Sequence, residues 1–305
     1  MTPRKTSQNR RSKGRKTTAS RKDPTDRSPR DSADSARRPS KTPSPAENRP
    51  SGNPRGADKR PKKQDGLWLY GIHAVNAALT NPERKCLRLV ATAGAAAALG
   101  DSPVAPDIVD RDAIEALLPF GAVHQGLAVL TNDLPTRRIE DIAEHADAHA
   151  RTVVVVLDQV TDPQNIGATL RSAAAFGAYA VIVPDRNTPD ATGAMAKAAS
   201  GALETVPLIR PNNLVRALET LKTHGFWVVG LDMDAPVSLP DADLPDRCVL
   251  ALGAEGRGLR RLTRETCDMM VRVPMTGRIE SLNVSASAAV SLYEWGRAAE
   301  SPTGR

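Results

Sequence analysis

Short apolar runs alternate with helix-like patterns along residues 67–131. Strands and helices that alternate in this way are typical of a small α/β domain. We expect strands at 67–70, 86–91 and 126–130, and helices at 73–79, 95–99 and 114–118. We place the domain at 66–132, and a linker at 133–151 whose second part is a polar helix at 139–150.

A second α/β domain is predicted at 152–305. Its first apolar run, 152–157, is β-branched and unbroken, which is typical of a strand buried on both faces of a parallel sheet. Further strands are expected at 179–183, 226–231, 249–252 and 269–273, with helices at 165–176, 191–199, 214–224 and 259–265. In the final helix an apolar stripe at helical spacing predicts a core face or a subunit contact, and it consists of Val284, Ala288, Leu292 and Trp295.

The amino-terminal segment has a different composition. Residues 2–66 contain no Leu, Ile, Val, Met, Phe, Tyr or Trp. Residues 1–64 hold 20 Lys and Arg against 6 Asp and Glu, a net charge of +14, which leaves 22 basic and 29 acidic residues, a net of −7, for the remainder. We therefore predict a disordered basic tail over 1–65. Two roles stay open for it: a solubilising extension, or attraction to RNA phosphates through counterion release.

Several classes of site and location are not supported by the sequence. The cysteines Cys86, Cys248 and Cys267 form no CxxC pair, and no apolar run is long enough to cross a membrane, so we expect a soluble cytoplasmic protein. His145 and His149 lie one helical turn apart, but no third ligand accompanies them. We predict a solvated helix face there and no metal site.

Glycine-rich and polar loops follow two strands of the second domain. The strand at 249–252 runs into GAEGRG (253–258), in which glycines let the backbone approach a ligand closely. The strand at 269–273 stops at Pro274, and a loop leads to SLNVS (281–285). Ligands of open α/β sheets collect at this edge. Glu255 is the single carboxylate of its loop, and a ligand site or a solvated surface turn both fit it when the loop is considered alone.

Three motifs together favour a ligand site over a solvated surface turn at Glu255. NIGATLR (165–171), followed by Phe176 and Gly177, resembles the first motif of the SpoU (TrmH) class of RNA 2'-O-ribose methyltransferases, within the SPOUT superfamily. LGAEGRGL (252–259) resembles the second motif and SLNVS the third, in the same order and at similar spacing. The resemblance covers roughly the whole chain after Gly66. A nicotinamide-binding GxGxxG, a Walker motif, a nucleophile elbow and a zinc pattern are all missing from the sequence.

The resemblance implies S-adenosylmethionine as the methyl donor. Its adenine would lie against backbone groups that correspond here to Gly253, Val273 and Leu282. Val273 and Leu282 also fit as core residues, and both interpretations can hold together. We expect the Gly253 loop to press its backbone against the cofactor, so that a branched side chain there would abolish binding with little loss of fold stability.

The resemblance also implies the residues that act on the RNA. We predict that Asn165 and Arg171 open the first helix and bind an RNA phosphate at its N-terminus. A guanidinium is always charged, so we assign Arg171 to stabilising developing negative charge and not to proton removal. Glu255 would orient Arg171 or Asn283. Ser281 and Asn283 would offer polar groups to the ribose or cofactor, or else cap the last helix.

Other features rest on the resemblance alone. It implies a deep trefoil knot in the second domain and a homodimer whose RNA sites are completed across the interface. YGIHAV (70–75) and HQGLAVL (124–130) are similar to the amino-terminal RNA-binding domain of the ribosomal-RNA members, while His73 and His124 also fit as ordinary hydrogen-bonded histidines. We therefore predict methylation of 23S ribosomal RNA, at a guanosine. The alternatives are a transfer-RNA 2'-O-methyltransferase and a non-catalytic ribosome-assembly factor.

Overall fold

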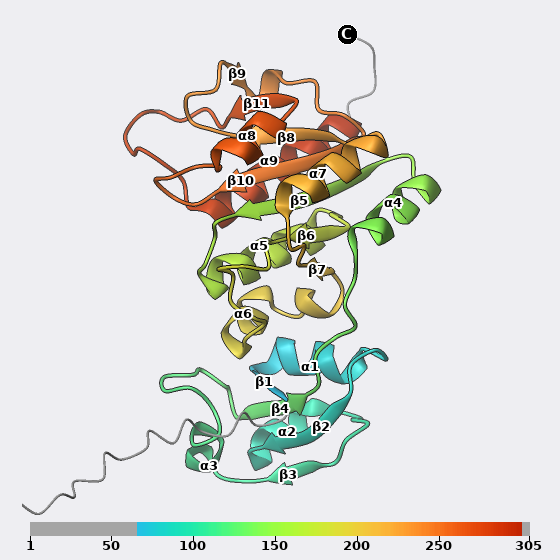
Figure 1. Ribbon diagram of the computed structural model, residues 1–305. Helices are drawn as coiled ribbons and strands as arrows, with labels where there is room; N and C mark the ends of the chain where they lie inside the picture. The colour runs from blue at the N-terminus through green and yellow to red at the C-terminus, as the bar shows by residue number, and fades with distance from the viewer. Residues whose placement is uncertain (1–65, 301–305) are drawn as a thin grey trace, which may run out of the picture. The chain divides into compact units, whose positions relative to one another are not determined.

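The computed structural model of the protein describes residues 66–300, with side chains up to residue 298. The predicted basic tail, 1–65, lies outside the described residues. The described part contains a small sheet and a large sheet (Figure 1). It contains no helix that is long and apolar enough to cross a membrane.

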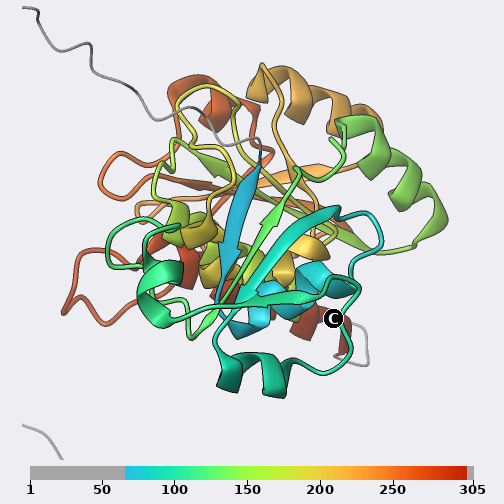
Figure 2. The ribbon, with the colours of Figure 1, turned by 90° about the horizontal axis from the view of Figure 1, so that it is seen from below.

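The small sheet has the strand order β1-β4-β2-β3. β4 pairs antiparallel with both β1 and β2, which lie on either side of it, and β3 adds to β2 in parallel (Figure 2). The strands are β1 (Leu67–Tyr70), β2 (Cys86–Ala91), β3 (Pro106–Ile108) and β4 (Leu127–Thr131), and the helices are α1 (Ile72–Thr80), α2 (Ala93–Leu99) and α3 (Arg111–Glu115). α3 begins earlier than expected because Asp110 caps it, with its Oδ1 accepting from the Ala113 N–H at 2.8 Å.

The large sheet is parallel throughout, in the order β7-β6-β5-β10-β8-β11-β9, which confirms the predicted parallel α/β fold. Its strands are β5 (Thr152–Asp158), β6 (Ala180–Ile182), β7 (Leu208–Ile209), β8 (Trp227–Leu231), β9 (Val237–Ser238), β10 (Arg247–Gly253) and β11 (Met269–Arg272). The helices are α4 (Ile139–Ala148), α5 (Pro163–Ala175), α6 (Gly193–Ala199), α7 (Leu214–Thr223), α8 (Arg261–Thr266) and α9 (Val284–Glu300), with short 3-10 helices η1 (Ala202–Glu204) and η2 (Leu239–Asp241).

The inner strand β5 is buried on both faces because its side chains alternate between two apolar layers. Val153 and Val155 belong to the core formed with α5, α6 and α9. Val154 and Val156 belong to the core formed with α4 and α7. The predicted stripe of α9 is part of the first core, with side chains no more than 6% exposed, and comprises Val284, Ala288, Leu292 and Trp295.

The start of α5 differs from the prediction. Pro163 occupies the first helical position, where its missing N–H costs nothing, and Asp162 caps the helix by accepting from the Gln164 N–H at 3.0 Å. Asn165 therefore lies in the first turn and Arg171 in the third. The prediction that both residues open the helix is wrong for Arg171, because Asp162 and Pro163 start the helix before the motif.

Three histidines also have surroundings that the sequence did not predict. The His145 ring lies between His149 and Tyr179, stacked on them with centroid distances of 3.9 and 4.0 Å, so this helix face is not simply solvated. His124 is fully buried. Its Nδ1 accepts from the Gly126 N–H at 3.1 Å, whereas its Nε2 has no hydrogen-bond partner within 66–300. The Nε2 atom lies 3.6 Å from Glu115 Oε1, too far for a hydrogen bond but within ion-pair distance.

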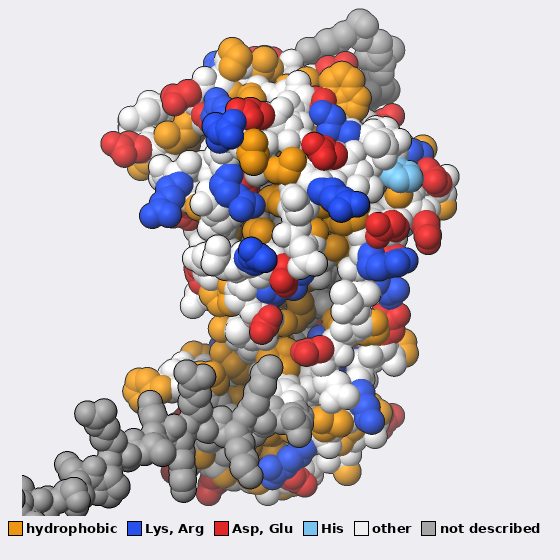
Figure 3. All heavy atoms as spheres, in the orientation of Figure 1, with side chains coloured by type: hydrophobic (Ala, Val, Ile, Leu, Met, Phe, Trp, Pro, Cys, Tyr) orange, Lys and Arg blue, Asp and Glu red, His pale blue; other side chains and the backbone are white. Residues whose placement is uncertain are grey.

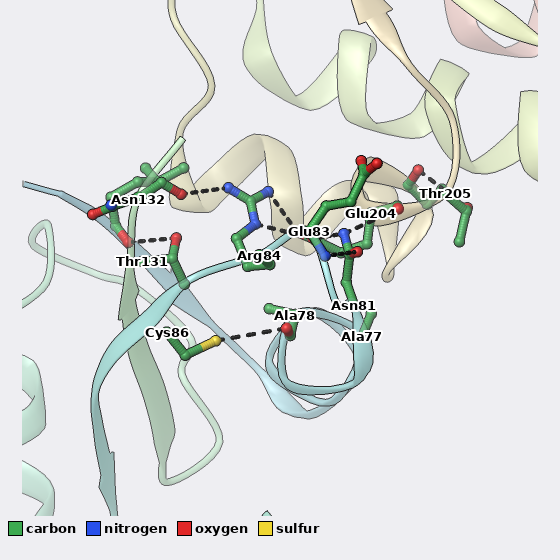
Figure 4. Close-up of polar contacts among 12 residues, drawn as sticks. Ala77, Ala78, Asn81, Glu83, Arg84, Cys86, Thr131, Asn132, Glu204 and Thr205 are labelled. Atoms are coloured by element: carbon green, nitrogen blue, oxygen red, sulfur yellow. Dashed lines mark hydrogen bonds and ion pairs between the residues drawn. The ribbon is translucent and has the colours of Figure 1, made fainter. Parts of the chain in front are cut away.

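A buried ion pair joins the loop before β2 to η1 (Figure 4). Arg84 and Glu204 form two parallel hydrogen bonds, of 2.7 and 3.0 Å, with side chains 2% and 3% exposed. Arg84 Nη1 also donates to the Asn132 carbonyl at 2.8 Å, and Asn81 donates to Glu204 Oε2 at 2.8 Å. Buried charges are tolerated when their hydrogen-bonding capacity is met in this way. This cluster is one of the contacts between the small sheet's domain and the layer of α6 and η1.

Candidate active site

A pocket of about 410 Å³ opens at the carboxyl ends of β8, β10 and β11. This is the edge at which ligands bind open parallel sheets, and the volume is in the range of small-molecule sites. All three residues that the sequence predicted for the cofactor line it: Gly253 at the end of β10, Val273 after β11, and Leu282 before α9. Val273 and Leu282 are half-buried, so both side chains face the pocket as well as neighbouring residues.

The Asn283 side chain links all three motifs at the edge of this pocket. Its Nδ2 donates to Asn165 Oδ1 at 2.9 Å and to Glu255 Oε1 at 3.1 Å. Its Oδ1 accepts from the backbone N–H of Ser285 at 2.9 Å and thereby caps α9. The Val284 N–H donates to the same Glu255 oxygen at 3.3 Å. Asn283 therefore caps α9, as one of the two interpretations predicted, and its role toward the ribose or cofactor stays a prediction.

The Gly253 loop is glycine-rich because it closes on itself. Gly258 donates its N–H to the Ala254 carbonyl at 2.8 Å, and a β-carbon at Gly253 would lie 1.9 Å from the Gly258 carbonyl carbon and 2.3 Å from the Leu259 nitrogen. Those atoms are backbone, so no side-chain movement relieves the clash. The expectation that a branched residue at Gly253 would leave fold stability nearly unchanged is therefore wrong.

The structure brings most of the predicted residues together. Glu255 and Ser281 line the pocket, and Asn165 and Asn283 lie beside it through the hydrogen bonds described above. Arg171 is separate: it is exposed on α5, does not line the pocket, and makes no ion pair within the described chain. Of the two partners predicted for Glu255, the structure selects Asn283.

The sequence reasoning missed several residues of the pocket wall. Asp232 and Met233 follow β8, and Met275 follows β11, and all three line the pocket. No motif marks them, although their positions directly after parallel strands could have indicated them. A further missed contact lies beneath the second motif, where the buried Asp158 carboxylate binds Arg260 at 2.7 Å.

The described residues also bear on metal binding and on cysteine reactivity. No group of three or more His, Cys, Asp or Glu side chains in residues 66–298 is arranged to hold a metal ion. Burial raises the pKa of Cys248 to about 12 and that of Cys267 to about 11. Both thiols are therefore protonated near neutral pH and poor nucleophiles.

Comparisons with known proteins define the class to which this chain belongs. The model of the SpoU rRNA Methylase family matches residues 152–293. The 23S rRNA (guanosine-2'-O-)-methyltransferase RlmB of Neisseria meningitidis serogroup B is 38% identical over 235 residues, which are 74% of this chain and 93% of that protein. RlmB of Salmonella typhi is also 38% identical, over 74% of this chain and 96% of that protein. The chain belongs to the SpoU rRNA methylase family, as its three motifs predicted.

A solved structure shows the same fold. The SpoU methyltransferase AviRb from Streptomyces viridochromogenes, in complex with the cofactor AdoMet, superposes with a TM-score of 0.67 at 22% identity, over 79% of this chain and 92% of that one.

Proposed function

We propose that this protein transfers a methyl group from S-adenosylmethionine to the 2'-hydroxyl of a guanosine in 23S ribosomal RNA. The observation that carries the proposal is the Asn283 side chain, which joins the three family motifs at the edge of the pocket. The names of the relatives reported above support the guanosine and 23S assignments.

The pocket suits the proposed cofactor. Backbone groups at Gly253, Val273 and Leu282 surround a space of about 410 Å³, and loop backbone can recognise an adenine without charged side chains. When bound, S-adenosylmethionine supplies an electrophilic methyl group carried on a positively charged sulfur. The protein then has to hold the 2'-oxygen in line with that methyl group and exclude water.

The polar residues beside the pocket have groups left for the RNA. Asn165 uses its Oδ1 as the acceptor for Asn283, which leaves its Nδ2 as a donor. Glu255 uses Oε1 for Asn283 and Val284, which leaves Oε2 as an acceptor. Ser281 lines the pocket with a hydroxyl that makes no hydrogen bond to other described residues. We assign these three groups to positioning the ribose, and leave the proton acceptor unassigned.

We also propose a homodimer, in which Arg171 contacts an RNA phosphate at the subunit face. Support comes from an apolar surface on α5 and α9, where Phe176 and Tyr293 pack edge to face at 6.1 Å and remain 37% and 56% exposed. Val290, 40% exposed, extends the same surface. Arg171 lies on the exposed side of α5, away from the pocket of its own chain. A dimer would cover the apolar surface and bring Arg171 to an RNA site.

The remaining assignments follow from the same function. We propose that residues 66–132 bind the ribosomal RNA, that the tail attracts RNA phosphates in the cytoplasm, and that the carboxyl-terminal region carries the trefoil knot of this class. On the face of the described residues seen in Figure 3, basic and acidic side chains are interspersed. The net charge of +14 at 1–64 therefore offers a separate source of attraction to RNA.

A tritium-transfer assay tests the function directly. Purified protein, labelled S-adenosylmethionine and a 23S ribosomal RNA transcript should yield labelled RNA, with the 2'-O-methyl mark mapped to a guanosine. The ribosomal RNA of a strain that lacks the gene should lack the same mark. Labelling of transfer RNA alone would favour the transfer-RNA alternative. Binding of RNA with no affinity for S-adenosylmethionine would favour the assembly factor and refute the proposal.

A further inference from the structure

Asp158, at the carboxyl end of β5, makes a contact that no family motif includes. Its carboxylate is fully buried, and both oxygens bind the same residue: Oδ1 accepts from Arg260 Nε at 2.7 Å, and Oδ2 accepts from the Arg260 backbone N–H at 3.0 Å. The two residues are 102 positions apart in the sequence. A buried carboxylate needs such partners, because an unpaired charge in the interior is strongly unfavourable.

The position of this contact relative to the second motif gives it a role. The loop begins at Gly253, which is paired with Asp158 in the β10–β5 register, and it ends at Arg260, the cap residue of α8. Asp158 therefore holds both ends of the loop: one through the strand pair and the other through its carboxylate. Within the loop, Gly258 bonds back to Ala254 and closes the turn.

Glu255 lies in the middle of this doubly held loop. It reaches Asn283 at 3.1 Å and the Val284 N–H at 3.3 Å, so both contacts lie near the long limit of a hydrogen bond and a small outward shift of the loop would break them. If Arg260 were released, only the strand end and the turn would fix the loop, and Glu255 would no longer be held at these distances. A small displacement of a positioned group is enough to slow a reaction that depends on alignment.

We propose that Asp158, acting through Arg260, is a positioning residue that holds the Glu255 loop against Asn283 and so sets the rate of methyl transfer. The inference rests on the proposed function. It adds the Asp158–Arg260 pair, which lies outside the three motifs, to the contacts that Asn283 makes with Asn165 and Glu255. A contact that only stabilises the fold would lower stability without depending on Glu255. A positioning contact acts through Glu255, so the loss in rate when the contact is removed should depend on whether Glu255 is present.

The test uses Arg260, because its side chain is 46% exposed whereas that of Asp158 is fully buried. Arg260→Gln should lower kcat about 100-fold, with the KM for the RNA near that of the parent. It should also lower the melting temperature, because it leaves the buried Asp158 carboxylate without its charge partner, so kcat is measured well below that temperature. Arg260→Lys, which restores a cation beside Asp158, should recover part of the rate. The matched control is Arg261→Gln, which removes a more exposed pair with Glu265 on the same helix and should leave kcat unchanged.

A double-mutant cycle with Glu255 decides between the two roles. Glu255→Gln should lower kcat in the parent but cost far less in the Arg260→Gln background, because Glu255 is already displaced there. Additive losses, or an Arg260→Gln enzyme as fast as the parent, would overturn the proposal. A second double-mutant cycle uses Asp158→Asn in place of Arg260→Gln. If the Asp158→Asn protein folds, its loss in kcat should be non-additive with that of Glu255→Gln in the same way. A parent protein that labels no RNA would instead contradict the proposed function and is detected first.

Discussion

Replacing Asn283 by aspartate separates the two roles that this side chain has in the structure. Aspartate is as good an N-cap as asparagine, so the acceptor for the Ser285 N–H is kept. The donor is lost, because an oxygen replaces Nδ2 opposite Asn165 Oδ1 and Glu255 Oε1, at 2.9 and 3.1 Å. Asn283→Asp should therefore keep α9 but break the link among the three motifs.

The expected loss follows from the bonds involved. A hydrogen bond to a charged group contributes about 1.5–3 kcal/mol, which corresponds to a fall in kcat/KM of roughly 10- to 100-fold. Repulsion between two carboxylates adds to this loss, although both side chains are exposed and water weakens the effect. Asn283→Ala removes the cap as well, and should in addition lower the free energy of unfolding by about 1 kcal/mol.

Asn213 supplies a matched control, because it caps α7 by accepting from the Arg216 N–H at 3.1 Å and does not line the pocket. Asn213→Ala should cost about the same 1 kcal/mol in a urea titration and leave methyl transfer unchanged. The assays are tritium transfer to the RNA transcript and chemical denaturation, for all variants. If Asn283→Asp transfers methyl at the parent rate, or loses activity only in proportion to its stability, the assignment of Asn283 to the site is wrong.

Five further outcomes are expected. Gly253→Ala should lower the free energy of unfolding by about 1–3 kcal/mol and should also lower cofactor affinity, because the added β-carbon meets the loop backbone. Leu282→Ala should lose roughly 1–3 kcal/mol of binding free energy for S-adenosylhomocysteine, measured by calorimetry, and should lose little stability. Arg171→Ala should remain a folded dimer by light scattering yet transfer no methyl group, and activity near the parent's would refute its role. Removal of residues 1–64 should flatten the plot of log RNA affinity against log salt and leave cofactor affinity unchanged, whereas an unaltered slope would favour a solubilising tail. Glu204→Gln should lower the free energy of unfolding by about 3–5 kcal/mol, since it leaves Arg84 buried without its charge partner, and an unchanged denaturation midpoint would contradict this account.

Much of the fold was determined by local sequence. The β-branched run of β5 and the α9 stripe predicted buried elements, because a period of two or of about 3.6 residues is a property of neighbours along the chain. The three motifs likewise identified the family and most of the pocket wall, since each consists of consecutive residues. Short elements were not predicted: β7 and β9 have two residues each, too few to form a pattern.

What only the tertiary structure decided are the pairings between distant residues. Asn283 meets Asn165 across 118 positions, and Arg84 meets Glu204 across 120. The requirement for glycine at position 253 also comes from the backbone of Gly258 and Leu259, which folds back beside it, a contact that the sequence did not indicate. The selection of Asn283 over Arg171 as the partner of Glu255 has the same origin. Composition and spacing specify which polar groups exist, but their partners depend on strand order and on the exact closure of loops, which residues far apart in the chain determine together.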